Sequence, residues 1–126
     1  MTGKYVGIDF GTKKVGVALS DESGAFAFPY GIFLPKDLKK VLTTLKEKES
    51  IQGIVFGLSV ATNGEENEVS SAIRDVARSV AAIAPVYFQQ EMFSSVEAHR
   101  YQTSAGDKDD SAAAIILQRF LDKTKK

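Results

Sequence analysis

The stretch from Tyr5 to Asp21, YVGIDFGTKKVGVALSD, most constrains how this chain can fold. Apolar residues alternate with others on both sides of Gly11 and Thr12, which is the pattern of two strands joined by a turn. Asp9 interrupts the first apolar run, where an unpaired carboxylate would be costly to desolvate. The stretch therefore predicts a β-hairpin whose first strand ends in an acid that needs a cation or an array of hydrogen-bond donors.

The motif from Asp9 to Thr12, D-x-G-T, leaves three interpretations open. A strand-end aspartate of this kind serves as a ligand in magnesium sites that hydrolyse phosphodiesters, or belongs to the ATP-binding loop of the actin, Hsp70 and sugar-kinase group. In the third interpretation, Asp9 is a buried residue that caps its own turn through the amides of Gly11 and Thr12. The motif alone does not choose among them, because short motifs recur by chance.

Length and composition narrow these interpretations. The chain has 126 residues, 44% of them hydrophobic, which is enough for one domain with a core of its own. Proteins of the ATP-binding group resemble two such domains joined around a nucleotide, so ATP binding becomes a minor alternative. The chain has 16 acidic and 16 basic residues, so no global positive field indicates a nucleic-acid partner. A local basic rim around an acidic metal site is still compatible with this balance.

The sequence also indicates where the protein works. It has no cysteine, which excludes disulfides and thiolate metal sites and agrees with a reducing compartment. It begins with a strand pattern rather than a signal peptide, and no apolar run reaches the ~18 residues of a membrane span. We therefore expect a cytoplasmic protein with no membrane partner.

Strand and helix patterns follow one another along the rest of the chain. Alternating or continuous apolar runs predict three more strands, and Pro29 makes the first of these an edge strand. Helical spacing of apolar residues and a capping box predict four helices. The predicted strands are 25–34, 51–58 and 85–89, and the predicted helices are 38–45, 69–83, one that begins at Ser94 or Ser95, and 109–121. This order predicts an α/β domain with a mixed five-stranded sheet flanked by helices.

Three acids fall at the ends of these predicted elements. Asp9 is on the first strand, Glu91 comes just after the last strand, and Asp110 is on the first turn of the closing helix. Hard divalent cations prefer oxygen ligands, and two such ions together activate a water and stabilise a leaving oxygen. Clustered carboxylates therefore favour hydrolysis of phosphodiesters with Mg²⁺ or Mn²⁺. Taken singly, Glu91 also fits a surface residue and Asp110 a partner of the helix dipole.

Four blocks of the chain resemble the YqgF/RuvX family, which is described as Holliday junction resolvases with an RNase H-like fold. The blocks are IDFGTKKVGVALSD, IVFGLSVATNGEENE, QEMFSSVEAHR and DKDDSAAAIILQRFLD, in the order and spacing of that family. The resemblance implies a single RNase H-like nuclease domain over residues 1–126. It also implies a role in resolving branched DNA or in maturing the 5′ end of pre-16S ribosomal RNA. By motif, the acids of the family fall on Asp9, Glu91 and Asp110, as metal ligands and catalytic residues.

The chain departs from the family where the chemistry is closest. The Asp-Glu-Arg of the family reads Gln90-Glu91-Met92, so one acid and one cation are missing. An arginine is suited to hold a scissile phosphate, and methionine is not. This departure motivates an alternative function, a catalytically weak ribosome-assembly or nucleic-acid-binding module.

Few other residues suggest contacts with a substrate. Thr12, Lys13 and Arg100 are the candidate substrate-binding residues, because they lie close in sequence to the acidic elements. The alternative for the two cations is a solvated surface charge. His99, the only histidine, fits a polar helix face better than a catalytic role. As partners we expect nucleic acid, either pre-rRNA or branched DNA, and a second copy of the chain in a homodimer.

Overall fold

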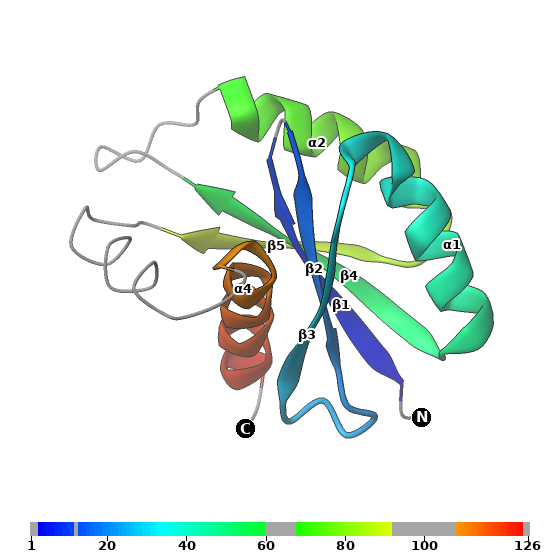
Figure 1. Ribbon diagram of the computed structural model, residues 1–126. Coiled ribbons are helices and arrows are strands. Elements are labelled where there is room, and N and C mark those ends of the chain that lie inside the picture. Colours follow the sequence, from blue (N-terminus) through cyan, green and yellow to red (C-terminus); the bar gives the residue numbers. More distant parts are fainter. Residues whose placement is uncertain (1–2, 12, 60–67, 92–107, 125–126) are drawn as a thin grey trace.

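The computed structural model describes residues 3–11, 13–59, 68–91 and 108–124 (Figure 1). Within these ranges, the side chains of residues 59, 68–70, 90–91, 108–111 and 124 are not described. The elements are β1 (Lys4–Phe10), β2 (Val15–Ser20), β3 (Ala27–Phe33), the short 3₁₀ helix η1 (Pro35–Asp37), α1 (Leu38–Lys48), β4 (Ile51–Ser59), α2 (Glu68–Val80), β5 (Val86–Glu91) and α4 (Lys108–Thr124). All five predicted strands and three of the four predicted helices are confirmed. The helix predicted from Ser94 or Ser95 lies outside the described residues.

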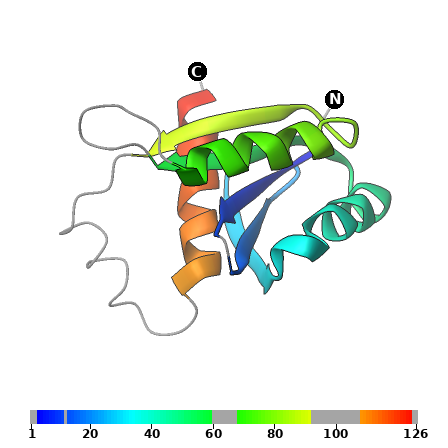
Figure 2. The same ribbon diagram turned by 90° about the horizontal axis from the view of Figure 1, so that it is seen from above.

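The strands form one mixed sheet in the order β3-β2-β1-β4-β5. β2 pairs antiparallel with both β1 and β3, whereas β4 pairs parallel with both β1 and β5. The predicted mixed five-stranded sheet is therefore confirmed, with Pro29 on an edge strand. Helices α1 and α2 cover one face of the sheet and α4 covers the other (Figures 1 and 2). None of the described helices is long and apolar enough to cross a membrane.

Strand alternation divides the apolar residues of the hairpin between two cores. Val6, Ile8 and Val17 pack with the buried leucines of α1 and with α2 on one face. Tyr5 and Ala18 pack on the other face, against α4. Because side chains alternate along a strand, Asp9 belongs to the same face as Tyr5 and Gly7, as the sequence predicted. The acid of the first strand therefore lies on the α4 side of the sheet.

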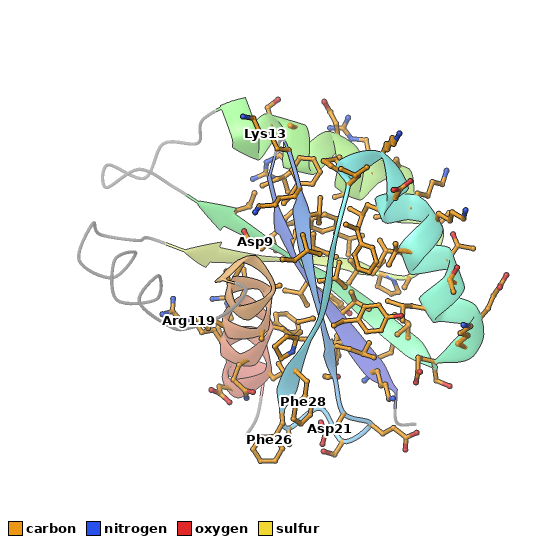
Figure 3. All side chains as sticks on the ribbon, viewed as in Figure 1. Asp9, Lys13, Asp21, Phe26, Phe28 and Arg119 are labelled. Atoms are coloured by element: carbon orange, nitrogen blue, oxygen red, sulfur yellow. The ribbon has the colours of Figure 1, made fainter. Side chains whose placement is uncertain are left out.

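The turn between β2 and β3 is held in shape by Asp21. Its carboxylate accepts hydrogen bonds from the backbone amides of Ala25 (2.9 Å) and Phe26 (3.1 Å) and from the hydroxyl of Ser23 (2.7 Å). The Ser23 hydroxyl, followed by these amides, lowers the pKa of the Asp21 carboxyl below its usual value. This end of the sheet, opposite Asp9, therefore carries a fixed negative charge at neutral pH (Figure 3).

A side chain of α4 ties the helix to the start of β3. The amide group of Gln118 accepts a hydrogen bond from the Ala27 backbone N–H and donates one to the Ala25 carbonyl, each at 2.9 Å. These residues lie more than 90 positions apart in the sequence. Gln118 therefore fixes the carboxyl-terminal half of α4 against the edge strand of the sheet. This contact also limits the position of the rest of the helix.

We expect Gln118→Ala to lower the free energy of unfolding by about 1–2 kcal/mol, because two half-buried backbone groups lose their partner. Urea denaturation measures this change. Gln52→Ala is the matched control, since the exposed Gln52 makes a single hydrogen bond, 2.9 Å long, to the Gly3 carbonyl. Equal losses of unfolding free energy in the two variants would show that the two hydrogen bonds of Gln118 add no more stability than the single bond of Gln52.

Candidate active site

The carboxyl ends of three parallel strands meet at one edge of the sheet. β1, β4 and β5 run in the same direction, and ligand sites of α/β sheets lie beyond such ends. Asp9 is the next-to-last residue of β1 and lies opposite Gly16 of β2. Glu91 ends β5, where it is paired with Ser59 at the end of β4. Two of the three predicted acids therefore lie at the same end of the sheet, on strands that flank β4.

Helix α4 approaches this sheet closely because two strand positions lack side chains. A Cβ atom on Gly7 would lie 2.6 Å from the Cβ of Leu117 and 2.9 Å from the carbonyl oxygen of Ala113. A Cβ atom on Gly57 would lie 2.5 Å from the Cδ1 of Ile116. Close packing of α4 on the sheet is therefore made possible by two glycines of the sheet. Glycine inside a strand is the sequence signal for such an approach.

The register between β1 and α4 sets the position of the third acid. The rings of Tyr5 and Phe120 lie 5.4 Å apart, and two residues further along β1 Gly7 contacts Leu117 and Ala113. The helix thus runs antiparallel to β1, and each step of two strand residues corresponds to about one helical turn. The next turn of α4 is its first turn, which contains Asp110, and it lies level with Asp9. The backbone of this first turn therefore lies toward the end of the sheet that carries Asp9, and a shared site of the two acids stays a prediction.

The acid cluster as a whole stays a prediction. Asp9 is half-buried, while the side chains of Glu91 and Asp110 are outside the described part. Among the side chains that are described, no three acids or histidines gather into a metal site. His99 also lies outside the described residues.

Of the three predicted substrate-binding residues, only Lys13 falls within the described ranges. Its side chain is exposed in the turn that joins β1 to β2, at the end of the sheet where Asp9 lies (Figure 3). Thr12 and Arg100 lie outside the described residues, as does Met92. Lys13 is therefore the one substrate-binding candidate whose side chain is described, and its contact with a phosphate stays a prediction.

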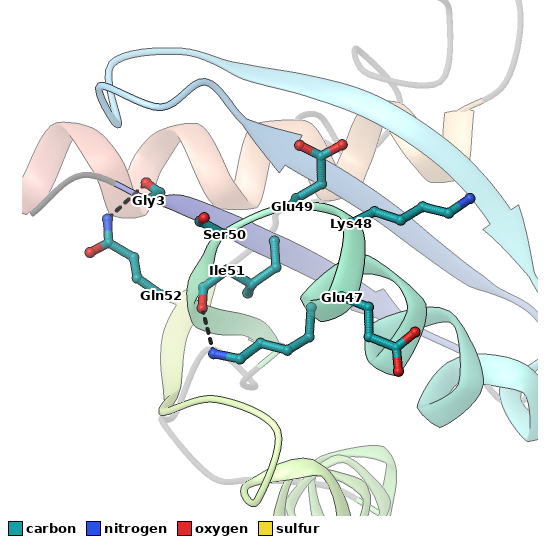
Figure 4. A pocket seen from close by; sticks show the side chains of 8 residues that line it. Gly3, Glu47, Lys48, Glu49, Ser50, Ile51 and Gln52 are labelled. Carbon is teal, nitrogen blue, oxygen red and sulfur yellow. Dashed lines mark hydrogen bonds between the residues drawn. The ribbon is translucent and has the colours of Figure 1, made fainter.

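A cavity of about 380 Å³ lies away from these acids, at the amino end of β1 (Figure 4). Two hydrogen bonds bridge its walls: Lys46 Nζ donates to the Ile51 carbonyl at 3.1 Å, and Gln52 Nε2 donates to the Gly3 carbonyl at 2.9 Å. Its charged lining residues are two lysines and two glutamates, Lys46, Lys48, Glu47 and Glu49. The balanced charge gives it no preference for an anionic substrate, so it is not the candidate active site.

The family described as "RuvX: Holliday junction resolvase" matches residues 3–123. The chain belongs to the RuvX family. This result confirms the resemblance seen in the sequence blocks. Among RuvX relatives, a protein of Chlorobaculum tepidum named "Putative pre-16S rRNA nuclease" is 34% identical over 94% of this chain and 93% of its own length. A protein of the same name from Hydrogenovibrio crunogenus is 35% identical over 95% of this chain and 94% of its own length.

Solved structures share the fold of this RuvX chain. T. thermophilus RuvC in complex with Holliday junction substrate aligns with a TM-score of 0.58 at 11% identity, over 94% of this chain and 93% of that one. Fowlpox virus resolvase with substrate Holliday junction DNA aligns with a TM-score of 0.52 at 12% identity, over the full length of both chains. At such identities the likeness shows the fold alone, and it confirms the predicted RNase H-like architecture.

We expect Gly7→Ala to destabilise the protein by about 1–3 kcal/mol, because the new methyl group meets the backbone of α4, which cannot rotate away. Gly57→Ala is the matched control and should cost less, since its methyl group meets the tip of the flexible Ile116 side chain. Urea denaturation of both variants tests this order. A Gly57→Ala loss as large as that of Gly7→Ala would contradict the tight contact between β1 and α4.

Proposed function

We propose that the chain, as one RNase H-like domain, is a nuclease that hydrolyses phosphodiester bonds in structured nucleic acid. The observation that supports this proposal is that Asp9, the end of β5 and the first turn of α4 lie toward the same end of the sheet. The chain's membership of the RuvX family agrees with it. Pre-16S rRNA and Holliday junction DNA are the two proposed substrates, after the names of its relatives and of the structures that share its fold. A homodimer and a cytoplasmic location stay predictions.

The proposed donors suit a hard divalent cation. Carboxylate oxygens are the ligands that Mg²⁺ and Mn²⁺ prefer, and Asp9 offers a carboxylate at a half-buried strand end on the α4 face. Alternation along β5 assigns position 91 to that face too, because Phe88 packs on the opposite face. We propose that Glu91 and Asp110 complete the set with Asp9. The chemistry gained from such an ion is a lowered pKa of a bound water and stabilisation of the leaving oxygen.

The chain itself contributes a fixed position for the Asp9 carboxylate and an electrostatic field that favours negative charge near it. Asp9 is held by a strand that pairs on both sides, so little reorganisation is needed to orient its carboxylate. The amino end of α4 points to the same place, where its dipole and free amides favour negative charge. Lys13 attracts the phosphate backbone from the neighbouring turn, and we propose Thr12 and Arg100 as further contacts.

We expect Asp9→Asn to reduce metal-dependent cleavage by more than about a hundredfold, because a neutral amide is a poor ligand for the cation. The assay offers a four-way DNA junction and a pre-16S rRNA fragment side by side, with Mg²⁺. Asp75→Asn, at an exposed position of α2 paired with Arg78, is the matched control and should cleave normally. Unchanged cleavage by Asp9→Asn, with the protein still folded, would overturn the assignment of this residue.

Gln90 and Met92 favour a second candidate function. In place of the acid and the arginine of the family motif, the chain has an amide and a thioether on either side of Glu91. As the alternative to the nuclease, we propose a catalytically weak ribosome-assembly or nucleic-acid-binding module, which binds nucleic acid without efficient turnover.

Met92→Arg tests this second function. We expect it to raise kcat/KM for cleavage at least about tenfold, because a guanidinium binds a phosphate through two parallel hydrogen bonds. Met92→Leu is the control, since it changes the shape but adds no charge. If Met92→Arg cleaves no faster than the native protein, the missing arginine does not limit activity and the argument for a weak enzyme loses its basis.

A further inference from the structure

The edge strand β3 carries most of the exposed apolar surface of the described residues. Four of the five large apolar side chains that are exposed there lie in positions 26–34: Phe26 (61% exposed), Phe28 (56%), Tyr30 (48%) and Leu34 (50%). A cluster of this kind on one strand marks an interaction surface more often than scattered exposure does. None of the predicted site residues belongs to it.

A bulge in β3 turns the Tyr30 ring toward α1. Pro29 pairs with Ala18 and Gly31 pairs with Val17, so Tyr30 is the extra residue between them. Its ring stacks on Phe33 with a centroid distance of 6.0 Å and an interplanar angle of 30°. Gly31 leaves room for this arrangement, because a Cβ there would lie 3.1 Å from the Phe33 ring.

Tyr30 and Phe33 line a hollow of about 220 Å³ against α1. Val41 and Thr44 line its other side, together with Lys40. The hollow therefore has two stacked aromatic rings on one wall and three residues of α1, one of them a lysine, on the other.

Lys40 is the cation that lines this hollow. Lys36, one helical turn before it in the sequence, and Lys39 are exposed like Lys40, and none of the three forms an ion pair with another described residue. Asp37 is the one acid between them in the sequence. The hollow thus combines two aromatic rings with a lysine, and a second lysine precedes it by four residues.

Two features argue against a second copy of the chain as the occupant. Pro29 has no N–H to offer to an added strand, which blunts the open edge of β3. A two-fold interface would also place the lysines of one copy against those of the other, which costs electrostatic energy. Aromatic rings beside lysines are instead the surface on which single-stranded nucleic acid binds, with bases on the rings and phosphates on the cations.

We propose that Tyr30, Phe33, Lys36 and Lys40 form a subsite for an unpaired nucleotide of the RNA substrate. The base stacks on Tyr30, and Lys36 and Lys40 hold the adjoining phosphates. This inference rests on the proposed function, because it assigns a place to the unpaired stretch that flanks the cleaved bond. A fully paired junction offers no free base face, so the subsite favours the precursor RNA among the two proposed substrates.

The subsite lies at the same end of the sheet as the candidate active site. Phe33 pairs with Val15, the first residue after the turn that carries Lys13. Ile32 pairs with Gly16, which pairs with Asp9, so these three residues form one row across β3, β2 and β1. Adjacent strands are about 4.8 Å apart, so the row spans about 10 Å. Asp9 belongs to the α4 face and the hollow to the α1 face, so a nucleic-acid strand that reaches both passes around the turn between β1 and β2, where Lys13 lies.

Binding of a fluorescein-labelled oligouridylate, measured by anisotropy, tests the subsite. The Asp9→Asn protein serves as the parent so that cleavage does not consume the probe. Tyr30→Ala should weaken binding about tenfold while leaving binding of a fully paired, blunt-ended RNA duplex unchanged, and Tyr30→Phe should restore it. Phe26→Ala is the control, because this exposed ring lies at the turn held by Asp21, away from Lys36 and Lys40, and its loss should leave binding unchanged.

The salt dependence of binding tests the cations separately. Lys40→Gln should reduce the slope of log Kobs against log salt concentration by about 0.7, the value expected for one phosphate contact on a single strand. Lys48→Gln removes the same charge at the other end of α1 and should leave the slope unchanged.

Several outcomes would overturn the subsite: normal binding by Tyr30→Ala, equal weakening by Phe26→Ala, or a dimer in light scattering that Tyr30→Ala turns into a monomer. The last result would show that the exposed apolar side chains at positions 26–34 form an interface between two copies of the chain. Failure of the proposed function has a different signature. In that case the native protein cleaves neither substrate, while the effects of Tyr30→Ala and Lys40→Gln on binding persist.

Discussion

The contact between α4 and the glycines of β1 and β4 determines the geometry on which the candidate site depends. A helix normally lies one side chain away from a sheet, but Gly7 and Gly57 let the backbone of α4 come nearer. Gln118 then fixes the helix along its length by binding the backbone at the start of β3. With the axis and the depth of α4 both set, its first turn has one position relative to Asp9. The catalytic proposal thus depends on packing as much as on carboxylates.

The topology explains why one face of β3 stays uncovered. Helix α1 must carry the chain from the end of β3 to the start of β4, and two strands, β2 and β1, lie between them in the sheet (Figure 1). It therefore lies across the middle of the sheet, where Leu42 and Leu45 are buried, and diverges from β3. The aromatic side chains on the edge strand lose their cover where the helix departs. The exposure of the aromatic residues on β3 is thus a consequence of the connection from β3 through α1 to β4. Lys40, at the start of α1, lies beside Tyr30 and Phe33 for the same reason.

Much of the fold could be predicted because the relevant signals are local. Alternation placed Val6 and Ile8 on one face and Gly7 and Asp9 on the other, and Pro29 marked an edge strand. The alternation of aromatic residues in 25–34 predicted the strand but not the bulge at Tyr30. Because of this extra residue, Ile32 pairs with Gly16 on the α4 face, whereas Phe28 pairs with Leu19 on the α1 face. A bulge depends on how two strands register, and no single-strand pattern contains that information.

The candidate site shows the same division between local and non-local information. The position of Asp9 within an apolar run was enough to single it out, since burial of a carboxylate is a local signal. The level of the first turn of α4, which contains Asp110, depends on the edge-to-face contact of Tyr5 with Phe120 and on the packing of α4 against Gly7, which only the fold provides. Net charge was the least informative property, because equal totals say nothing about where the charges lie. Lys13 lies in the turn that follows the strand of Asp9, whereas Asp21 lies at the opposite end of the sheet (Figure 3). A lysine in that turn attracts a phosphate chain locally even though the chain as a whole is neutral.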